Sequence, residues 1–135
     1  MALQYGTTLR NNQLDAIETT VGTSPLLRIL TGSPPATCAT AQSGTLLVEM
    51  TLPSDWMAAA SSGSKAKSGT WQDTSADGTG TAGYFRIVDS GGTTCHVQGT
   101  VTATGGGGDL TLDNTSIASG QSVTISTFTI TAGNA

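Results

Sequence analysis

The chain has 135 residues and a mass of 13.5 kDa, the size of one domain with a single core. Only 10% of the residues are charged, so threonine, serine and glycine carry most of the polar surface. A charge-poor surface of this kind favours lasting contact with neighbouring subunits. The net charge of −4, with five Lys and Arg residues in all, argues against a phosphate-binding surface and against nucleic acid as a partner.

The first residues show neither the basic stretch nor the apolar run of a secretory signal, and no apolar run of about 18 residues follows. We therefore expect a soluble protein made without a targeting segment and without a membrane partner. Under that expectation Cys38 and Cys95 are predicted to be free thiols. The alternative is one disulfide between them, formed if the protein is released into an oxidising medium.

The start of the chain has the pattern of an amphipathic helix. Leu9, Leu14, Ile17 and Val21 recur at helical spacing, and Gly22 is a natural helix stop. The spacing predicts a helix over residues 8–21. We accordingly divide the chain into an N-terminal arm with an amphipathic helix, residues 1–22, and a single β-domain, residues 23–135.

The middle of the chain alternates short strands with long loops. Residues 26–31 and 45–52 are predicted strands, the second with one buried face, and residues 33–44 form a long loop between them. Ser54 is a plausible N-cap for a short helix over residues 55–60. Residues 61–80 are predicted to be mostly loop.

The last third predicts paired strands. Residues 83–89 and 93–103 form a hairpin, and residues 105–108 form a flexible hairpin turn into a strand with Leu110 and Leu112. The apolar face of residues 122–131 switches near Ser126, which indicates a β-bulge. Six or seven such strands predict a mainly β fold, an antiparallel β-sandwich or jelly-roll-like domain with one N-terminal helix.

No residue pattern indicates catalysis. His96 is the only histidine and lies on the polar face of its predicted strand, and no Gly-x-Ser-x-Gly elbow supplies a nucleophile. A metal site with Cys95 is disfavoured because adjacent strand residues point to opposite faces and a third ligand is missing. The glycines at 105–108 match neither a tandem calcium repeat nor a phosphate loop. We expect no enzyme, cofactor or metal.

Other candidate residues have an ordinary structural explanation. The pairs Asp73 with Asp77 and Asp109 with Asp113 have no aromatic trough around them and are expected to be solvated turn residues. Trp56 and Trp71 are open to three interpretations: core packing, a subunit interface, or stacking on sugar rings. The candidate interface residues are Leu3, Tyr5, Leu9, Arg10, Trp56 and Trp71.

Three segments together resemble small virion proteins of tailed bacteriophages, and the resemblance spans nearly the whole chain. They are the helix LRNNQLDAIETT at 9–20, the stretch LPSDWMA at 52–58, and the strand TCHVQGTVTATGGGG at 94–108. Among these proteins the chain looks most like the capsid cement, or decoration, proteins. The N-terminal helix is a departure from the best-known trimeric decoration proteins.

The resemblance implies a structural protein of the virion that binds and stabilises the capsid shell. Its partners would be the major capsid protein and further copies of itself, as a dimer or trimer, on the capsid surface of a particle assembled in the host cytoplasm. The arm at residues 1–10 and the Thr- and Gly-rich loops would contact the shell, with main-chain pairing to strand edges. The alternatives are a phage tail or fibre protein and a carbohydrate-binding module that uses the two tryptophans.

Overall fold

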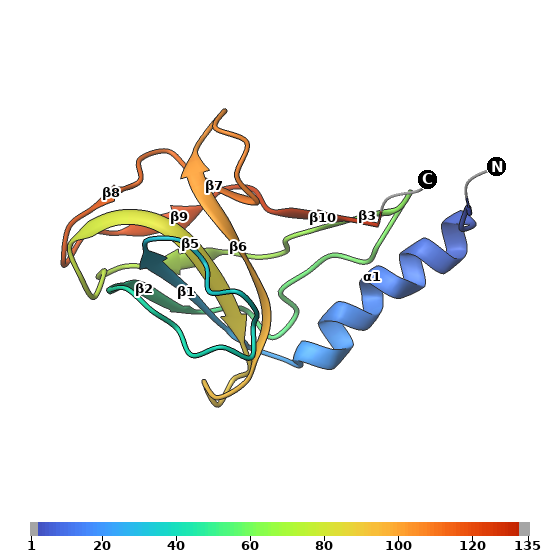
Figure 1. Ribbon diagram of the computed structural model, residues 1–135. Coiled ribbons are helices and arrows are strands. Elements are labelled where there is room, and N and C mark those ends of the chain that lie inside the picture. The colour runs from blue at the N-terminus through green and yellow to red at the C-terminus, as the bar shows by residue number, and fades with distance from the viewer. Residues whose placement is uncertain (1–2, 133–135) are drawn as a thin grey trace.

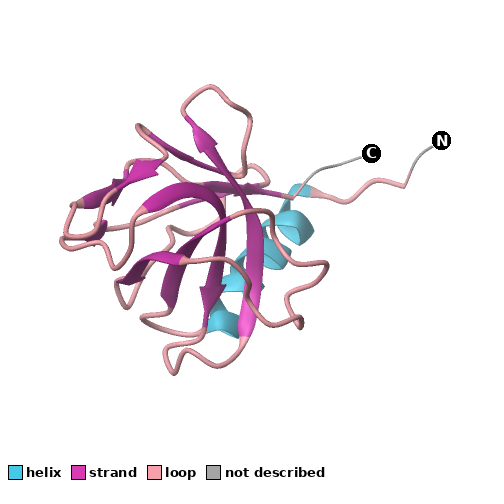
Figure 2. Ribbon diagram, turned by 60° about the vertical axis from the view of Figure 1, so that its left-hand side comes forward, coloured by secondary structure: helices cyan, strands magenta, loops and turns pink. Residues whose placement is uncertain are grey.

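The computed structural model describes residues 3–132 and is mainly β, with one N-terminal helix and a curled, antiparallel-rich sheet in a β-sandwich-like domain (Figures 1 and 2). This confirms the predicted fold class. The elements are α1 Thr7–Val21, β1 Leu26–Thr31, β2 Leu46–Thr51, β3 Ser64–Ala66, β4 Trp71–Asp73, β5 Gly80–Val88, β6 Cys95–Ala103, β7 Leu110–Leu112, β8 Ser116–Ile117, β9 Val123–Ile125 and β10 Thr129–Thr131.

The main sheet has the strand order β2-β1-β5-β6-β7, and β8 pairs with the start of β5. Two short antiparallel ribbons, β3 with β10 and β4 with β9, complete the domain. The core lies on the face of the main sheet that carries Leu27, Ile29, Phe85 and Ile87, which are all at most 1% exposed.

A chain of aromatic rings fills this core. The ring centroids of Trp56 and Trp71 are 6.0 Å apart, those of Trp71 and Phe128 are 5.5 Å apart, and those of Phe85 and Phe128 are 5.6 Å apart. Both tryptophans have 0% exposure. The core-packing interpretation is therefore confirmed. The expectation that Trp56 and Trp71 contact a partner or a sugar is wrong for this structure, because neither ring reaches the surface.

The predicted helix is confirmed with one more residue at its start. It ends at Val21 because Gly22 has φ +91° and its N–H donates to the Glu18 carbonyl. Leu14 and Val21 are its buried residues, whereas Leu9, predicted on the same apolar stripe, is 48% exposed.

The predicted hairpin is also confirmed, as β5 and β6 joined by residues 89–94. Asp89 holds this turn together. Its Oδ1 accepts hydrogen bonds from the backbone N–H groups of Thr93 at 2.8 Å and Thr94 at 3.3 Å. These two hydrogen bonds stabilise the carboxylate and lower the pKa of Asp89.

The short helix predicted at residues 55–60 is absent, because this segment is extended and pairs with residues 66–68. The Ala58 N–H donates to the Ala66 carbonyl, and the Ser68 N–H donates to the Trp56 carbonyl. Trp56 and Met57 are adjacent and both buried, which the extended backbone permits. Residues 61–80, predicted as mostly loop, contain β3 and β4.

Two predictions near the C-terminus need correction. The strand with Leu110 and Leu112 exists, but it pairs with β6 in parallel, so residues 104–109 are not a simple hairpin turn. The predicted bulge near Ser126 is instead a break between β9, which pairs with β4, and β10, which pairs with β3. The switch of the apolar face thus marks a change of strand partner.

The loop at residues 33–44 covers the other face of the main sheet. A disulfide joins Cys38 to Cys95, with 5.3 Å between the Cα atoms, so the prediction of free thiols is wrong. Tyr84 Oη donates to the Ser43 carbonyl at 2.6 Å, and Gln98 Nε2 donates to the Pro35 carbonyl at 2.8 Å. The topology brings the two cysteines together because this loop returns across β5 and β6.

We predict that replacing Cys38 and Cys95 with serine lowers the free energy of unfolding by roughly 4 kcal/mol, the chain-entropy value for a bridge that spans 57 residues. Denaturant unfolding measures the change. Reducing the wild-type disulfide with a thiol reagent should give the same loss, and the reagent should leave the double serine variant unchanged. Equal stability of the wild-type and variant proteins would contradict the prediction.

Candidate protein-binding surface at the N-terminal helix

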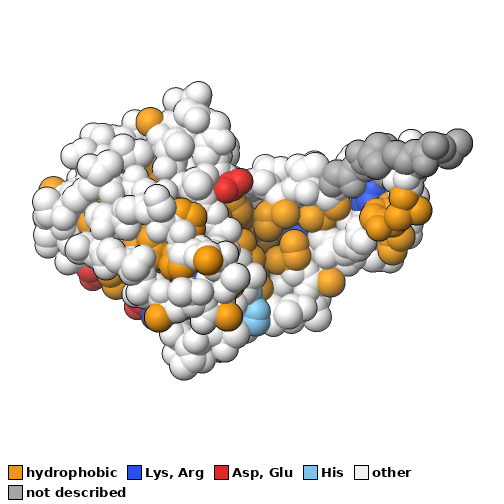
Figure 3. Space-filling view, viewed as in Figure 1, with side chains coloured by type: hydrophobic (Ala, Val, Ile, Leu, Met, Phe, Trp, Pro, Cys, Tyr) orange, Lys and Arg blue, Asp and Glu red, His pale blue; other side chains and the backbone are white. Residues whose placement is uncertain are grey.

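Helix α1 lies outside the sandwich, with its N-terminal end pointing away from the body (Figure 1). The exposed large apolar side chains of the described residues are Leu3, Tyr5 and Leu9, with exposures of 73%, 39% and 48%. Apolar side chains gather at the free end of the helix and again where the helix meets the body (Figure 3). We call residues 3–9 the apolar tip.

The helix is attached to the body near the apolar tip by two polar contacts. Arg10 Nε donates to the Ala132 carbonyl at 2.9 Å, and the Gly63 N–H donates to Asn11 Oδ1 at 2.9 Å. Gly63 has φ +73°, and a Cβ on it would lie 2.1 Å from the Arg10 guanidinium. Arg10, expected at the interface, thus has a role within the chain: it anchors α1 beside the end of β10.

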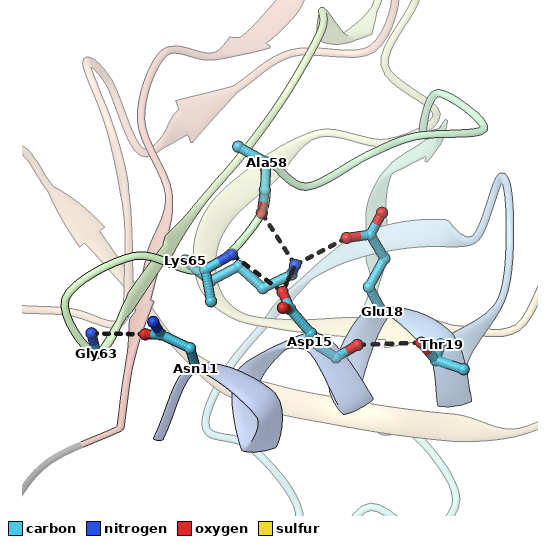
Figure 4. A network of polar contacts seen from close by, with 8 residues as sticks. Asn11, Asp15, Glu18, Thr19, Ala58, Gly63 and Lys65 are labelled. Carbon is cyan, nitrogen blue, oxygen red and sulfur yellow. Dashed lines mark hydrogen bonds and ion pairs between the residues drawn. The ribbon is translucent and has the colours of Figure 1, made fainter. Parts of the chain in front are cut away.

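A buried lysine attaches the middle of the helix (Figure 4). The side chain of Lys65 is 2% exposed, and its Nζ lies 2.7 Å from Asp15 Oδ1, 2.9 Å from Glu18 Oε2 and 2.9 Å from the Ala58 carbonyl oxygen. All three ammonium donors therefore have acceptors. Asp15 Oδ1 also accepts the Ala60 N–H at 3.0 Å. We call Lys65, Asp15 and Glu18 the lysine clamp.

The contacts of the lysine clamp shift the pKa values of Asp15 and Lys65 in opposite directions. The hydrogen bonds from Lys65 and from the Ala60 N–H lower the pKa of Asp15 below its ordinary value of 3.8. Burial of Lys65 opposes its charge, but the hydrogen bonds to Asp15 and Glu18 outweigh it and raise the Lys65 pKa above 10.5. Asp15 and Lys65 are thus both charged at neutral pH.

On another side of α1, two adjoining hollows separate the helix from β6 and β10. Their volumes are about 320 and 490 Å³, and they share Ile17 and Val97. Phe128 and Ile130 contribute further apolar surface to the larger hollow, and half-buried His96 lines the smaller one. We call the pair the helix groove. Its lining suits apolar side chains of another protein.

The edge of β6 beside the helix groove is open. Within residues 3–132, β7 pairs only with Val101–Ala103, so no described strand pairs with residues 95–100 on the side away from β5. An open strand edge beside an apolar groove is the arrangement that accepts an added strand from a partner.

Asp109 is exposed as expected, but Asp73 is half-buried at the end of β4 with its Oδ2 buried, so the prediction of a solvated turn residue is wrong for Asp73. Asp109 Oδ2 accepts the Thr100 N–H at 2.9 Å, and Asp73 Oδ1 accepts the Ser75 N–H at 2.9 Å. Across residues 3–132, no three His, Cys, Asp or Glu side chains are grouped as metal ligands. No described helix is long and apolar enough to cross a membrane.

Comparisons with known proteins found no match, whether with family models, with curated proteins or with solved structures.

The lysine clamp and the helix groove were not predicted from the sequence. Lys65 lies in a segment predicted as loop, where a lysine is ordinarily solvated. The alternation Lys65-Ala66-Lys67 before Trp71 is too short to mark a strand. Asp15 and Glu18 do show a signal in retrospect: they are two acids one turn apart on α1, with no basic residue three or four positions from either one.

We predict that Lys65→Met lowers the free energy of unfolding by roughly 2 kcal/mol. This is less than the loss on breaking a fully buried ion pair, because Asp15 and Glu18 are partly exposed and regain water. Amide hydrogen exchange in α1 should accelerate more than exchange in β5. Lys67→Met is the matched control, expected to change stability by at most about 0.5 kcal/mol. Unchanged protection of α1 in Lys65→Met would contradict the role of the clamp.

We also predict that acid releases α1. The pKa of Asp15 is lower in the folded protein than its ordinary value of 3.8. The stability that the ionised Asp15 adds is therefore complete at pH values above 3.8, and it is lost as the pH falls through the pKa of the folded protein. Amide protection in α1 should therefore decrease as the pH falls below about 4. In Asp15→Asn that acid dependence should weaken. Protection that falls identically in both proteins would assign the effect to another group.

Proposed function

We propose that this protein is an assembly subunit that binds other protein subunits, and that it acts as a capsid cement protein on a phage head. The observation that carries the proposal is the apolar tip. Leu3, Tyr5 and Leu9 are the exposed large apolar side chains of the described residues, and apolar side chains gather at the free end of the helix (Figure 3). The capsid as the partner comes from the resemblance to small virion proteins.

The apolar tip gives the proposed binding a source of free energy. Full burial of a completely exposed large apolar side chain contributes about 1.5–3 kcal/mol, and Leu3, at 73% exposure, has more left to gain than Tyr5 or Leu9. Three of them in one segment therefore suit an anchor that enters a pocket on a partner. Repetition of the contact over many equivalent sites would stabilise a shell even where one contact is weak.

The attachment of α1 supports the same proposal. Arg10, Asn11 and the lysine clamp fix the helix to the body by polar contacts. The apolar tip is thus presented from a positioned helix, which reduces the ordering cost of binding. The charge-poor surface, with 10% charged residues, adds little repulsion at close contact.

The alternatives differ in how they fit the structure. The carbohydrate-binding module loses its basis because both tryptophans are buried in the core. A tail or fibre protein would use the same apolar tip and the same open edge of β6. The location of the protein in the particle decides between the head and the tail.

We predict that electron cryomicroscopy of particles made with and without this chain shows its density over the head, and that heads lacking the chain break at lower temperature. Density confined to the tail would replace the cement role with a tail role. Absence of the protein from the particle would reject both.

The combined variant Leu3→Ser and Leu9→Ser tests the apolar tip directly. It should keep the unfolding free energy near that of the wild type, because these two side chains are exposed, but lose binding to purified heads by at least tenfold. The control Thr70→Ser with Thr124→Ser, at exposed positions outside the tip, should bind normally. Undiminished binding by the Leu3 and Leu9 double variant would reject the tip as the contact.

A further inference from the structure

The outer face of the main sheet, under the loop at residues 33–44, carries an unbalanced row of charge. The register places Glu49 opposite Arg28, Arg28 opposite Arg86, and Arg86 opposite Gln98. The row therefore holds two guanidinium groups and one carboxylate. Like charges directly opposite each other destabilise a sheet unless another charge compensates them.

Arg28 forms an ion pair with Glu49, the one carboxylate of the row. Its Nε lies 2.7 Å from Glu49 Oε2, and its other nitrogens donate to Gln42 Oε1 at 3.3 Å and to the Gly92 carbonyl at 3.4 Å. Asp89, in the hairpin beside the row, accepts hydrogen bonds from Thr93 and Thr94. Among the described residues, neither carboxylate forms an ion pair with Arg86.

Arg86 is buried without a counter-charge. Arg86 is only 5% exposed. Within residues 3–132, no carboxylate oxygen lies within 4.0 Å of its guanidinium nitrogens. Its Nη2 donates to the carbonyls of Thr40 at 2.6 Å and Thr37 at 3.4 Å. Its Nε is buried with no acceptor, and Nη1 donates to no described group.

A cavity of about 220 Å³ adjoins this guanidinium. Arg28, Arg86, Thr40, Gln42 and Thr93 line it, and the disulfide between Cys38 and Cys95 borders it. A group of a few heavy atoms fits this volume. Because an uncompensated buried cation is costly, a cavity beside one favours a small anion.

We propose that this cavity is a binding site for a small oxyanion, either a carboxylate or inorganic phosphate. Arg86 would donate from Nη1, since a guanidinium recognises oxyanions through charge-assisted hydrogen bonds. The bound anion would give the row a second negative charge, so it would also tighten the loop at residues 33–44 onto the sheet. This proposal does not depend on the cement role, because it concerns a different face of the molecule.

The test is thermal unfolding of the full chain with rising sodium phosphate or sodium acetate, against sodium chloride at constant ionic strength. We expect a saturable rise in melting temperature of several degrees with phosphate, acetate or both. A response to phosphate alone identifies the ligand as phosphate, and a response to acetate alone identifies a carboxylate. No saturable rise with either anion overturns the proposal.

Arg86→Gln assigns the effect, and Lys67→Gln controls for the same loss of one positive charge at a half-buried position. The saturable rise should vanish in Arg86→Gln and persist in Lys67→Gln. Persistence in Arg86→Gln overturns the assignment. If Arg86→Gln does not fold, the Arg86 side-chain NMR signals of the wild type replace it: they should shift saturably with the anion, and unchanged signals overturn the proposal.

Discussion

The fold depends on strand β5, which must be covered on both faces. Six of its nine residues are buried, and they alternate between two sides of the sheet. On one side Phe85 and Ile87 pack in the aromatic core, which the ribbons β3–β10 and β4–β9 close. On the other side Tyr84 and Arg86 lie under the loop at residues 33–44. This loop has little apolar surface of its own, and the disulfide fixes it to the sheet.

The aromatic core and the loop at residues 33–44 cover the two faces of β5 with different chemistry, and this difference explains where a binding site arises. The core side is closed by apolar packing. The loop side is closed by side-chain hydrogen bonds to the carbonyls of Pro35, Thr40 and Ser43. Carbonyls carry only partial charge, so those of Thr37 and Thr40 accept hydrogen bonds from Arg86 Nη2 without balancing the charge of the guanidinium. The cavity beside Arg86 lies on this side.

The sequence was most informative where one period continued over many residues. The helix was predicted because Leu14, Ile17 and Val21 keep the helical spacing over several turns. The β5–β6 hairpin was predicted because the alternation from Cys95 to Ala103 continues over several residue pairs. Residues 55–60 were mispredicted because local helix signals near Ser54 competed with the burial of adjacent Trp56 and Met57. The disulfide and the lysine clamp join residues at least 47 positions apart, such as Lys65 and Glu18, so no local pattern reports them.

Helix α1 is attached mainly by polar contacts, whereas the sandwich is held together by apolar packing. It buries only Leu14 and Val21, so apolar packing alone holds it weakly. Arg10, Asn11, Asp15 and Glu18 supply the remaining attachment by polar contacts on the side that faces the body. Because polar groups hold the helix there, Leu3 and Leu9 stay exposed at the tip. A partner can therefore bury Leu3 and Leu9 without unfolding any part of the core.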